Sequence, residues 1–153
     1  MISVLGSGPI HFSLLRCTKM NILFVCRGNL QRSPTAEDMM KVRTGEEVNV
    51  RSAGINRTAR TRIDKDLLNW ADYIYVMRES IKKHIENEFP NLSEKRDINV
   101  FNIPDRYRRG EPRLKKRLLE EFSKDSLLSR YAKKEDLEEM KGKGEDSLFD
   151  RFP

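Results

Sequence analysis

A cysteine and an arginine separated by five residues stand in the best-patterned part of this 153-residue chain. Cys26 and Arg32 bound the stretch Cys-Arg-Gly-Asn-Leu-Gln-Arg, and Ser33 and Pro34 follow directly. The planar guanidinium of an arginine binds two phosphate oxygens at once, and a thiolate held beside a bound phosphate is a nucleophile. The spacing therefore indicates a loop that binds a phosphate group and attacks its phosphorus.

The residues inside this stretch favour a tight curl of the backbone. Gly28 and Asn29 are residue types that tolerate left-handed conformations, which would turn successive amide groups inward toward an anion. The hydroxyl of Ser33 is placed to hydrogen-bond the thiolate. We predict that Cys26 and Arg32 are catalytic and that the phosphate is bound by Arg27, Gly28, Asn29, Leu30, Gln31 and Ser33.

The spacing alone is weak evidence, because the chain is rich in arginine and a lone cysteine after a strand is often an inert core residue. The neighbouring elements decide in favour of the phosphate loop. Residues 22–25, Ile-Leu-Phe-Val, predict a strand buried on both faces. Ser33 is predicted to cap a helix that has Pro34 in its first turn and ends at Gly45. The loop would then lie between a strand and a helix, where backbone N–H groups converge on anions.

The rest of the chain repeats this alternation of strand and helix. It predicts strands near residues 48–52, 73–77 and 98–103, and helices near residues 62–70, 79–89 and 112–122. This order is typical of an α/β protein, a three-layer α/β/α sandwich with a four-stranded parallel sheet.

The two ends of the chain are expected to lie outside the sheet and its helices. We predict a flexible extension over residues 1–19, one domain over residues 20–125, and a charged C-terminal helix or tail over residues 126–153. Leu127, Leu128, Tyr131 and Leu137 are predicted to form one more amphipathic helix that docks on this domain.

A second candidate catalytic group follows the fourth predicted strand. Breaking a phosphate ester requires a proton for the departing oxygen, and Asp105 lies at the sheet edge where a donor is needed. Asp105 also suits a simple turn after Pro104. Glu111 is a competing acid, but its position before Pro112 fits the start of the last helix. The sequence therefore favours Asp105.

Composition narrows the class of protein. The chain has 37% hydrophobic residues, two cysteines and a net charge of +6. These values indicate a single folded domain without a disulfide framework, expected in the cytoplasm. No run approaches the roughly 18 to 20 apolar residues of a membrane span. Aromatic residues are too sparse, and too separate from the basic ones, for a nucleic-acid surface.

The loop resembles that of the low-molecular-weight protein tyrosine phosphatase family, V-C-x-G-N-x-C-R-S-P. Here it is Val-Cys-Arg-Gly-Asn-Leu-Gln-Arg-Ser-Pro, with Gln31 in place of the family's second loop cysteine. The resemblance extends through Ser-Ala-Gly at residues 52–54 and Ile-Pro-Asp at residues 103–105, and covers about residues 20–122.

The resemblance implies hydrolysis of phosphate monoesters, with protein phosphotyrosine as the expected substrate and a phosphocysteine intermediate. It implies that Asp105 is the proton donor, that Tyr107 lines an aromatic wall, and that neither a metal nor another cofactor is needed. The family's Asp-Pro-Tyr reads Asp-Arg-Tyr here, and Asn56 and Arg57 occupy positions where an aromatic residue often lines the pocket.

Two alternatives remain at this level. An arsenate reductase shares the fold and loop, but it needs further cysteines, and the chain offers only Cys17. A non-catalytic phosphate-binding or nucleic-acid-binding module would account for the basic charge. Arginines in the loops near the mouth of the predicted phosphate site either favour acidic phosphopeptides or another polyanion, or are simply solvated. Seven arginines are expected there: Arg27, Arg57, Arg60, Arg62, Arg106, Arg108 and Arg109.

Overall fold

The computed structural model describes residues 19–132, so nearly all of the predicted N-terminal extension lies outside the described residues. A parallel sheet forms the centre of the molecule, with the strand order β2-β1-β3-β4. Its strands are β1 (Met20–Cys26), β2 (Val48–Gly54), β3 (Tyr73–Val76) and β4 (Ile98–Val100). The predicted four-stranded parallel sheet is confirmed.

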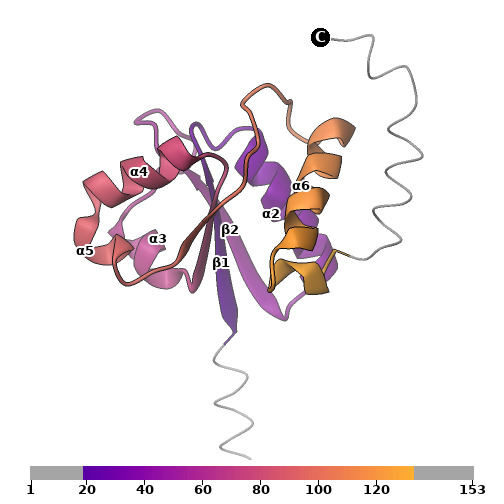
Figure 1. Ribbon diagram of the computed structural model, residues 1–153, viewed down its shortest axis with the longest axis horizontal. Helices are drawn as coiled ribbons and strands as arrows, with labels where there is room; N and C mark the ends of the chain where they lie inside the picture. Colours follow the sequence, from indigo (N-terminus) through magenta and orange to yellow (C-terminus); the bar gives the residue numbers. More distant parts are fainter. Residues whose placement is uncertain (1–18, 133–153) are drawn as a thin grey trace, which may run out of the picture.

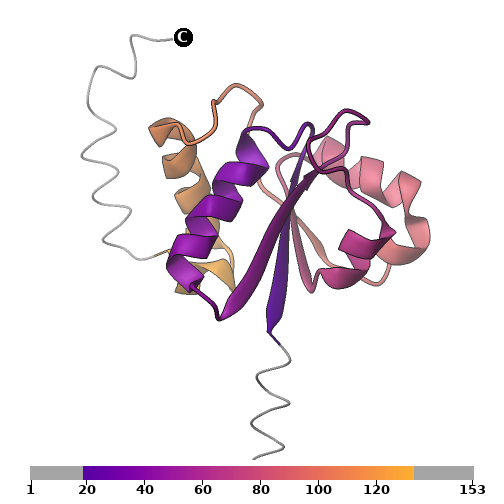
Figure 2. The same cartoon turned by 180° about the vertical axis from the view of Figure 1, so that it is seen from behind.

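Helices cover both faces of this sheet (Figures 1 and 2). One face carries α2 (Arg32–Thr44) and α6 (Pro112–Lys124), and the other carries α3 (Lys65–Trp70), α4 (Glu79–Glu88) and α5 (Pro90–Ser93). The predicted three-layer α/β/α sandwich is therefore also confirmed.

The central strand β1 explains where the phosphate loop lies. Its apolar residues 22–25 have no exposed surface, as expected for a strand covered by helices on both sides. Cys26 ends β1 beside Gly54 at the end of β2, and Val25 pairs with Val76 at the end of β3. Because the strands are parallel, the segments that follow them meet at one edge of the sheet.

The start of α2 differs from the prediction. The helix begins at Arg32 with Gln31 at the cap position, and Gln31 makes no side-chain capping bond. Ser33 is not the cap, because its hydroxyl contacts the sulfur of Cys26 instead. Pro34 lies in the first turn and Gly45 ends the helix, as predicted.

Other helices and strands also begin or end at residues different from those predicted. The helix expected from residue 62 begins at Lys65, because Arg62 forms a bridge to Gly54 and Asp64 caps the helix through the N–H of Leu67 at 2.8 Å. The short α5 was not predicted. β4 ends at Val100 instead of residue 103, although the N–H of Ile103 still donates to Met77 at 3.1 Å.

The described part of the predicted C-terminal helix forms one turn of 3-10 helix, η1 (Leu128–Arg130), and not an α-helix. The carboxylate of Asp125 accepts the N–H groups of Leu127 and Leu128 at 3.0 and 2.9 Å, which favours a tight turn at this point. Leu128 is fully buried. Leu137 lies outside the described residues.

Candidate active site

The sulfur of Cys26 lies at the base of the loop, among hydrogen-bonding groups. Its residue is only 3% exposed. The Sγ atom lies 3.0 Å from the Oγ atom of Ser33, and the backbone N–H of Asn29 donates to it at 3.2 Å. Both groups can stabilise a negative charge on the sulfur.

The curl of the loop depends on Asn29, which has a φ of 55°. Gly28, which also tolerates a left-handed conformation, does not adopt one. The side-chain amide of Asn29 explains the difference, because it donates to Ser33 at 3.1 Å and to Ser52 at 2.8 Å. These two bonds hold the unusual backbone conformation in place.

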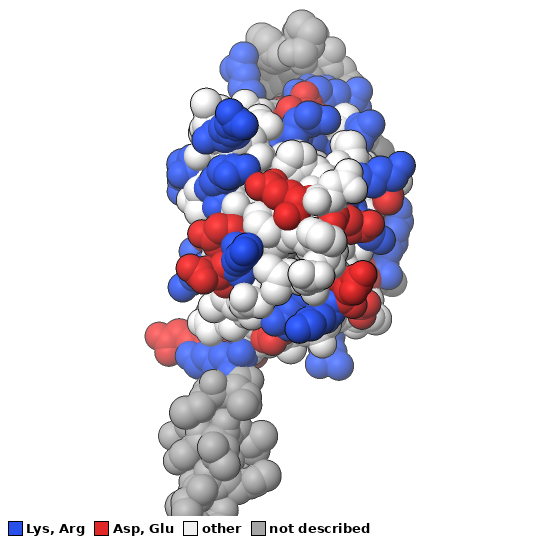
Figure 3. Space-filling model, turned by 90° about the vertical axis from the view of Figure 1, so that its left-hand side faces the viewer, with Lys and Arg blue, Asp and Glu red and all other residues white. Residues whose placement is uncertain are grey.

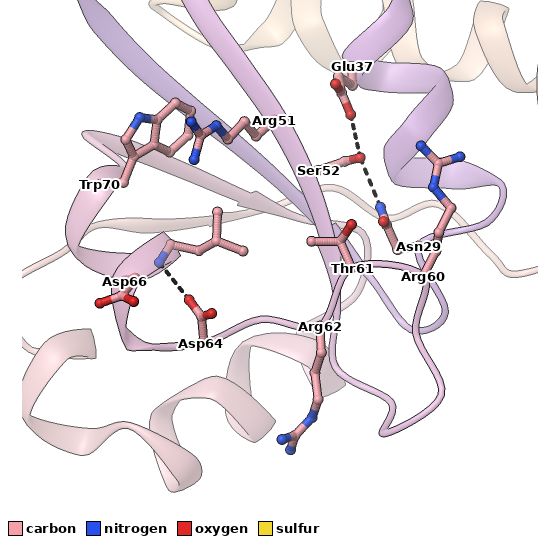
Figure 4. A pocket seen from close by; sticks show the side chains of 11 residues that line it. Asn29, Glu37, Arg51, Ser52, Arg60, Thr61, Arg62, Asp64, Asp66 and Trp70 are labelled. Carbon is pink, nitrogen blue, oxygen red and sulfur yellow. Dashed lines mark hydrogen bonds between the residues drawn. The ribbon is translucent and has the colours of Figure 1, made fainter.

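The network around Asn29 continues away from the sulfur. The hydroxyl of Ser52 donates to the Oε1 atom of Glu37 at 2.5 Å. Asn29, Ser52 and Glu37 line one side of a pocket of about 610 Å³, whose other side includes Arg51 and Trp70 (Figure 4). The pocket therefore lies behind the phosphate loop, beside the edge strand β2.

The carbonyl groups of the loop are held by the segment that follows β2. Cys26, Arg27 and Gly28 accept N–H groups of residues 55, 56 and 60 at 3.1, 2.9 and 3.1 Å. Within residues 19–132, the N–H groups of Gly28, Leu30 and Gln31 donate to no protein acceptor. Together with the N–H of Asn29, which donates to the sulfur, these unpaired amides can form an anion nest.

Gly54 permits this close approach, and its steric role was missed by sequence reasoning. A Cβ atom at Gly54 would lie 2.5 Å from the carbonyl oxygen of Arg27, 2.8 Å from the Cβ of Ala59 and 2.9 Å from the nitrogen of Asn29. The signal in the sequence is a glycine at the end of a strand next to the loop, where backbones approach closely.

Arg32 is buried beside the loop, with 1% of its surface exposed. Its Nη1 atom donates to the carbonyl of Ile103 at 2.8 Å, whereas its buried Nε atom has no hydrogen-bond partner. Burial lowers the pKa of the Arg32 guanidinium, and the charges of Asp105 and Cys26 oppose this shift. A guanidinium stays charged under such conditions, so Arg32 can attract an anion.

Asp105 lies next to this arginine, as the shared sheet edge suggested. Its Oδ1 atom is 3.5 Å from the Nε atom of Arg32, and its side chain is 57% exposed. The competing acid Glu111 instead accepts hydrogen bonds from the backbone of Arg108 and from the side chain of Arg113, both at 2.9 Å. Burial would raise the pKa of Glu111, but these bonds hold it below its usual value.

The outer residues of the loop and Tyr107 differ in exposure. Leu30 is 58% exposed, and Arg27 and Gln31 also face solvent. Tyr107 is only 5% exposed, and the guanidinium of Arg106 lies 5.4 Å from the centre of its ring. Little of the predicted aromatic wall is therefore open to solvent in this conformation.

Within residues 19–132, no group of three or more His, Cys, Asp or Glu side chains is arranged to hold a metal ion. In the same part of the chain, no helix is both long enough and apolar enough to cross a membrane.

The fold and the loop define a class of α/β protein that places a cysteine and an arginine around a phosphate-sized nest. Residues 21–71 match the family model described as low molecular weight phosphotyrosine protein phosphatase. The low molecular weight protein-tyrosine-phosphatase Ptp of Acinetobacter johnsonii is 30% identical, over 60% of this chain and 82% of that protein. The chain belongs to this family, and it is a protein phosphatase that hydrolyses phosphoric monoesters.

Solved structures support the same fold. The phosphatase SP-PTP of Streptococcus pyogenes matches with a TM-score of 0.57 and 22% identity, covering 78% of this chain and 97% of that one. The YwlE arginine phosphatase of Geobacillus stearothermophilus matches with a TM-score of 0.54 and 22% identity, covering 80% and 96%.

Proposed function

We propose that this phosphatase acts through a covalent phosphocysteine at Cys26 and that its substrate is phosphotyrosine in proteins. The observation that carries the proposal is the set of donors around one sulfur atom. The Ser33 hydroxyl and the Asn29 N–H contact the sulfur, and the guanidinium of Arg32 is buried beside the same loop.

In the first step, the thiolate of Cys26 attacks phosphorus, and the bond between phosphorus and the tyrosine oxygen breaks. Protonated Asp105 gives its proton to that oxygen, so the leaving group departs as a neutral phenol. The loop amides and Arg32 bind the phosphoryl oxygens, on which charge is concentrated in the transition state.

In the second step, the Asp105 carboxylate takes a proton from water while the water oxygen attacks phosphorus. The sulfur–phosphorus bond breaks, which releases inorganic phosphate and regenerates the thiolate. Ser33 supports this step, because its hydroxyl at 3.0 Å can donate to the departing sulfur. No metal enters either step.

Phosphotyrosine is proposed because of the family's description and because an aryl oxygen is a leaving group that an aspartic acid can protonate. A relative of the same fold is named as an arginine phosphatase, so phosphoarginine is the natural competing substrate. The arsenate reductase alternative has less support, because Cys26 is the one free cysteine among residues 19–132.

The test is turnover of an aryl phosphate in the presence of a metal chelator. We expect Cys26→Ser to lower kcat by about 10⁴-fold or more while phosphate still binds, because the nucleophile is lost and the nest is kept. Asp105→Asn should lower kcat by about 10²-fold or more. Cys17→Ser is the matched control and should retain activity.

Retained turnover in Cys26→Ser would remove this cysteine from the mechanism. A tyrosine-phosphorylated peptide and an arginine-phosphorylated peptide of the same sequence should be compared in the same assay. Preference for the arginine-phosphorylated peptide would overturn the proposed substrate and leave the chemistry intact.

A further inference from the structure

Three exposed arginines, Arg27, Arg78 and Arg106, lie in the segments that follow β1, β3 and β4, at the sheet edge that carries the phosphate loop. We call them the mouth arginines. Arg27 comes directly after β1, and Arg78 comes two residues after β3. The N–H of Met77 donates to Val25 at 3.0 Å, which sets the ends of these two strands at the same level. Arg106 follows Asp105, which lies 3.5 Å from Arg32.

The effect of these charges reaches the centre of the site. Burial is the main cause that lowers the pKa of Arg32, and the positive charges of Arg27 and Arg78 lower it further. Figure 3 shows Lys and Arg side chains gathered at the upper end of one face, the end at which the strands finish in Figure 1.

Some arginines elsewhere on the surface are paired with carboxylates. Arg62 contacts Glu88 at 2.9 Å, and Arg109 contacts Asp38 at 3.0 Å. Within residues 19–132, none of the three mouth arginines has such a partner. Asp105, the sequence neighbour of Arg106, lies beside Arg32, and Glu79, the sequence neighbour of Arg78, makes no ion pair with it. The mouth therefore carries positive charge that the described chain does not neutralise.

We propose that Arg27, Arg78 and Arg106 select phosphopeptides that carry carboxylate side chains next to the phosphorylated residue. The proposal rests on the proposed function. A bound phosphate is matched by Arg32 and the loop amides, so the charges of the mouth arginines are left for a second anionic group. Arg106 also donates to the hydroxyl of Tyr107 at 3.4 Å. Exposed charges arranged in this way discriminate between partners and speed their encounter.

The test uses two phosphotyrosine peptides of equal length, one with glutamates beside the phosphotyrosine and one with glutamines at the same positions. Their affinities for the Cys26→Ser protein and their kcat/KM values with the native enzyme are measured at low ionic strength. We expect the affinity and the kcat/KM value to be about tenfold higher for the glutamate peptide. Each exposed arginine should contribute a factor of about two to three.

Replacing Arg27, Arg78 and Arg106 together by glutamine should make the affinities and the kcat/KM values of the two peptides nearly equal. Arg130→Gln is the matched control. It removes the same charge from η1, at the far end of α6 from the mouth, and should keep the native ratio. Added salt should also reduce the native ratio, because these charges are exposed.

Equal affinities for the two peptides, or a preference that survives the triple substitution, would overturn the proposal. The two kinds of failure are distinguishable. Turnover of both peptides without discrimination refutes the role of the arginines alone. Selective binding to the Cys26→Ser protein without any turnover by the native enzyme refutes the proposed function and supports the role of the arginines.

Discussion

The sulfur of Cys26 is set apart from an ordinary buried cysteine by the groups that contact it. Ser33 and Asn29 place a hydroxyl and a backbone N–H at 3.0 and 3.2 Å. An apolar environment would disfavour a thiolate, whereas donors at these distances favour it. A residue with 3% exposure can therefore still be a nucleophile.

Gly54 gives a prediction at the scale of one residue. Gly54→Ala would place a Cβ atom 2.5 Å from the Arg27 carbonyl and 2.9 Å from the Asn29 nitrogen, both backbone atoms that cannot turn aside. We expect a loss of about 1–3 kcal/mol in the free energy of unfolding, measured with urea, because a tightly packed region must shift.

Gly28→Ala is the matched control for stability. Its Cβ atom would meet only Leu30, at 3.8 Å, which is an ordinary contact. The free energy of unfolding should then stay within about 0.5 kcal/mol of the native value. An unchanged stability in Gly54→Ala would show that the loop and the end of β2 are not held this closely.

At the scale of elements, the 3-10 turn after α6 is tied to the sheet by one hydrogen bond. The hydroxyl of Tyr75 on β3 donates to Asp125 at 2.9 Å, and Asp125 also accepts the N–H groups that start the turn. The ring of Tyr75 stacks on Phe101 and lies beside Phe24 in the core. This bond therefore links the turn to the aromatic core.

Tyr75→Phe tests this link through pH. Burial, followed by the hydrogen bond to Asp125, raises the pKa of Tyr75 well above its usual range. A folded-state pKa above the unfolded value of about 10 gives stability that is present below that pH and lost as pH rises beyond it. At about pH 8 we expect the variant to be less stable by about 1 kcal/mol, the value of one hydrogen bond.

Above about pH 10 the free energies of unfolding of the two proteins should converge. Only the native protein loses the contribution of a protonated phenol as the pH rises. Urea unfolding at several pH values measures this difference. A difference between the two proteins that stays constant across the whole range would contradict the account of Tyr75.

At the scale of the whole molecule, the order of strands and helices could be predicted because local patterns determine it. The apolar run at residues 22–25 is buried on both faces, and the amphipathic pattern of residues 112–122 packs on the sheet. The position of Asp105 beside Arg32 also follows from the parallel topology. Arg32 comes after β1 and Asp105 comes after β4, and both strands end at the same edge of the sheet.

Other features depend on contacts between distant segments, and the sequence does not reveal them. Ser33 has the residue type of a helix cap, but the nearby sulfur takes its hydroxyl. Gly28 is the more permissive residue, yet Asn29 takes the left-handed conformation, because Ser33 and Ser52 bind its side chain. Arg78 was overlooked because its place at the mouth follows from strand register and not from any local motif.

The central claim is that phosphate passes through a covalent bond to Cys26, and trapping that bond tests it most directly. The native enzyme is mixed with an aryl phosphate and quenched rapidly, and the peptide that contains Cys26 is analysed by mass spectrometry. We predict one phosphoryl group on Cys26, with none in the Cys26→Ser protein handled in the same way. A phosphoryl group on another residue, or steady turnover with no phosphoenzyme at any quench time, would contradict the account.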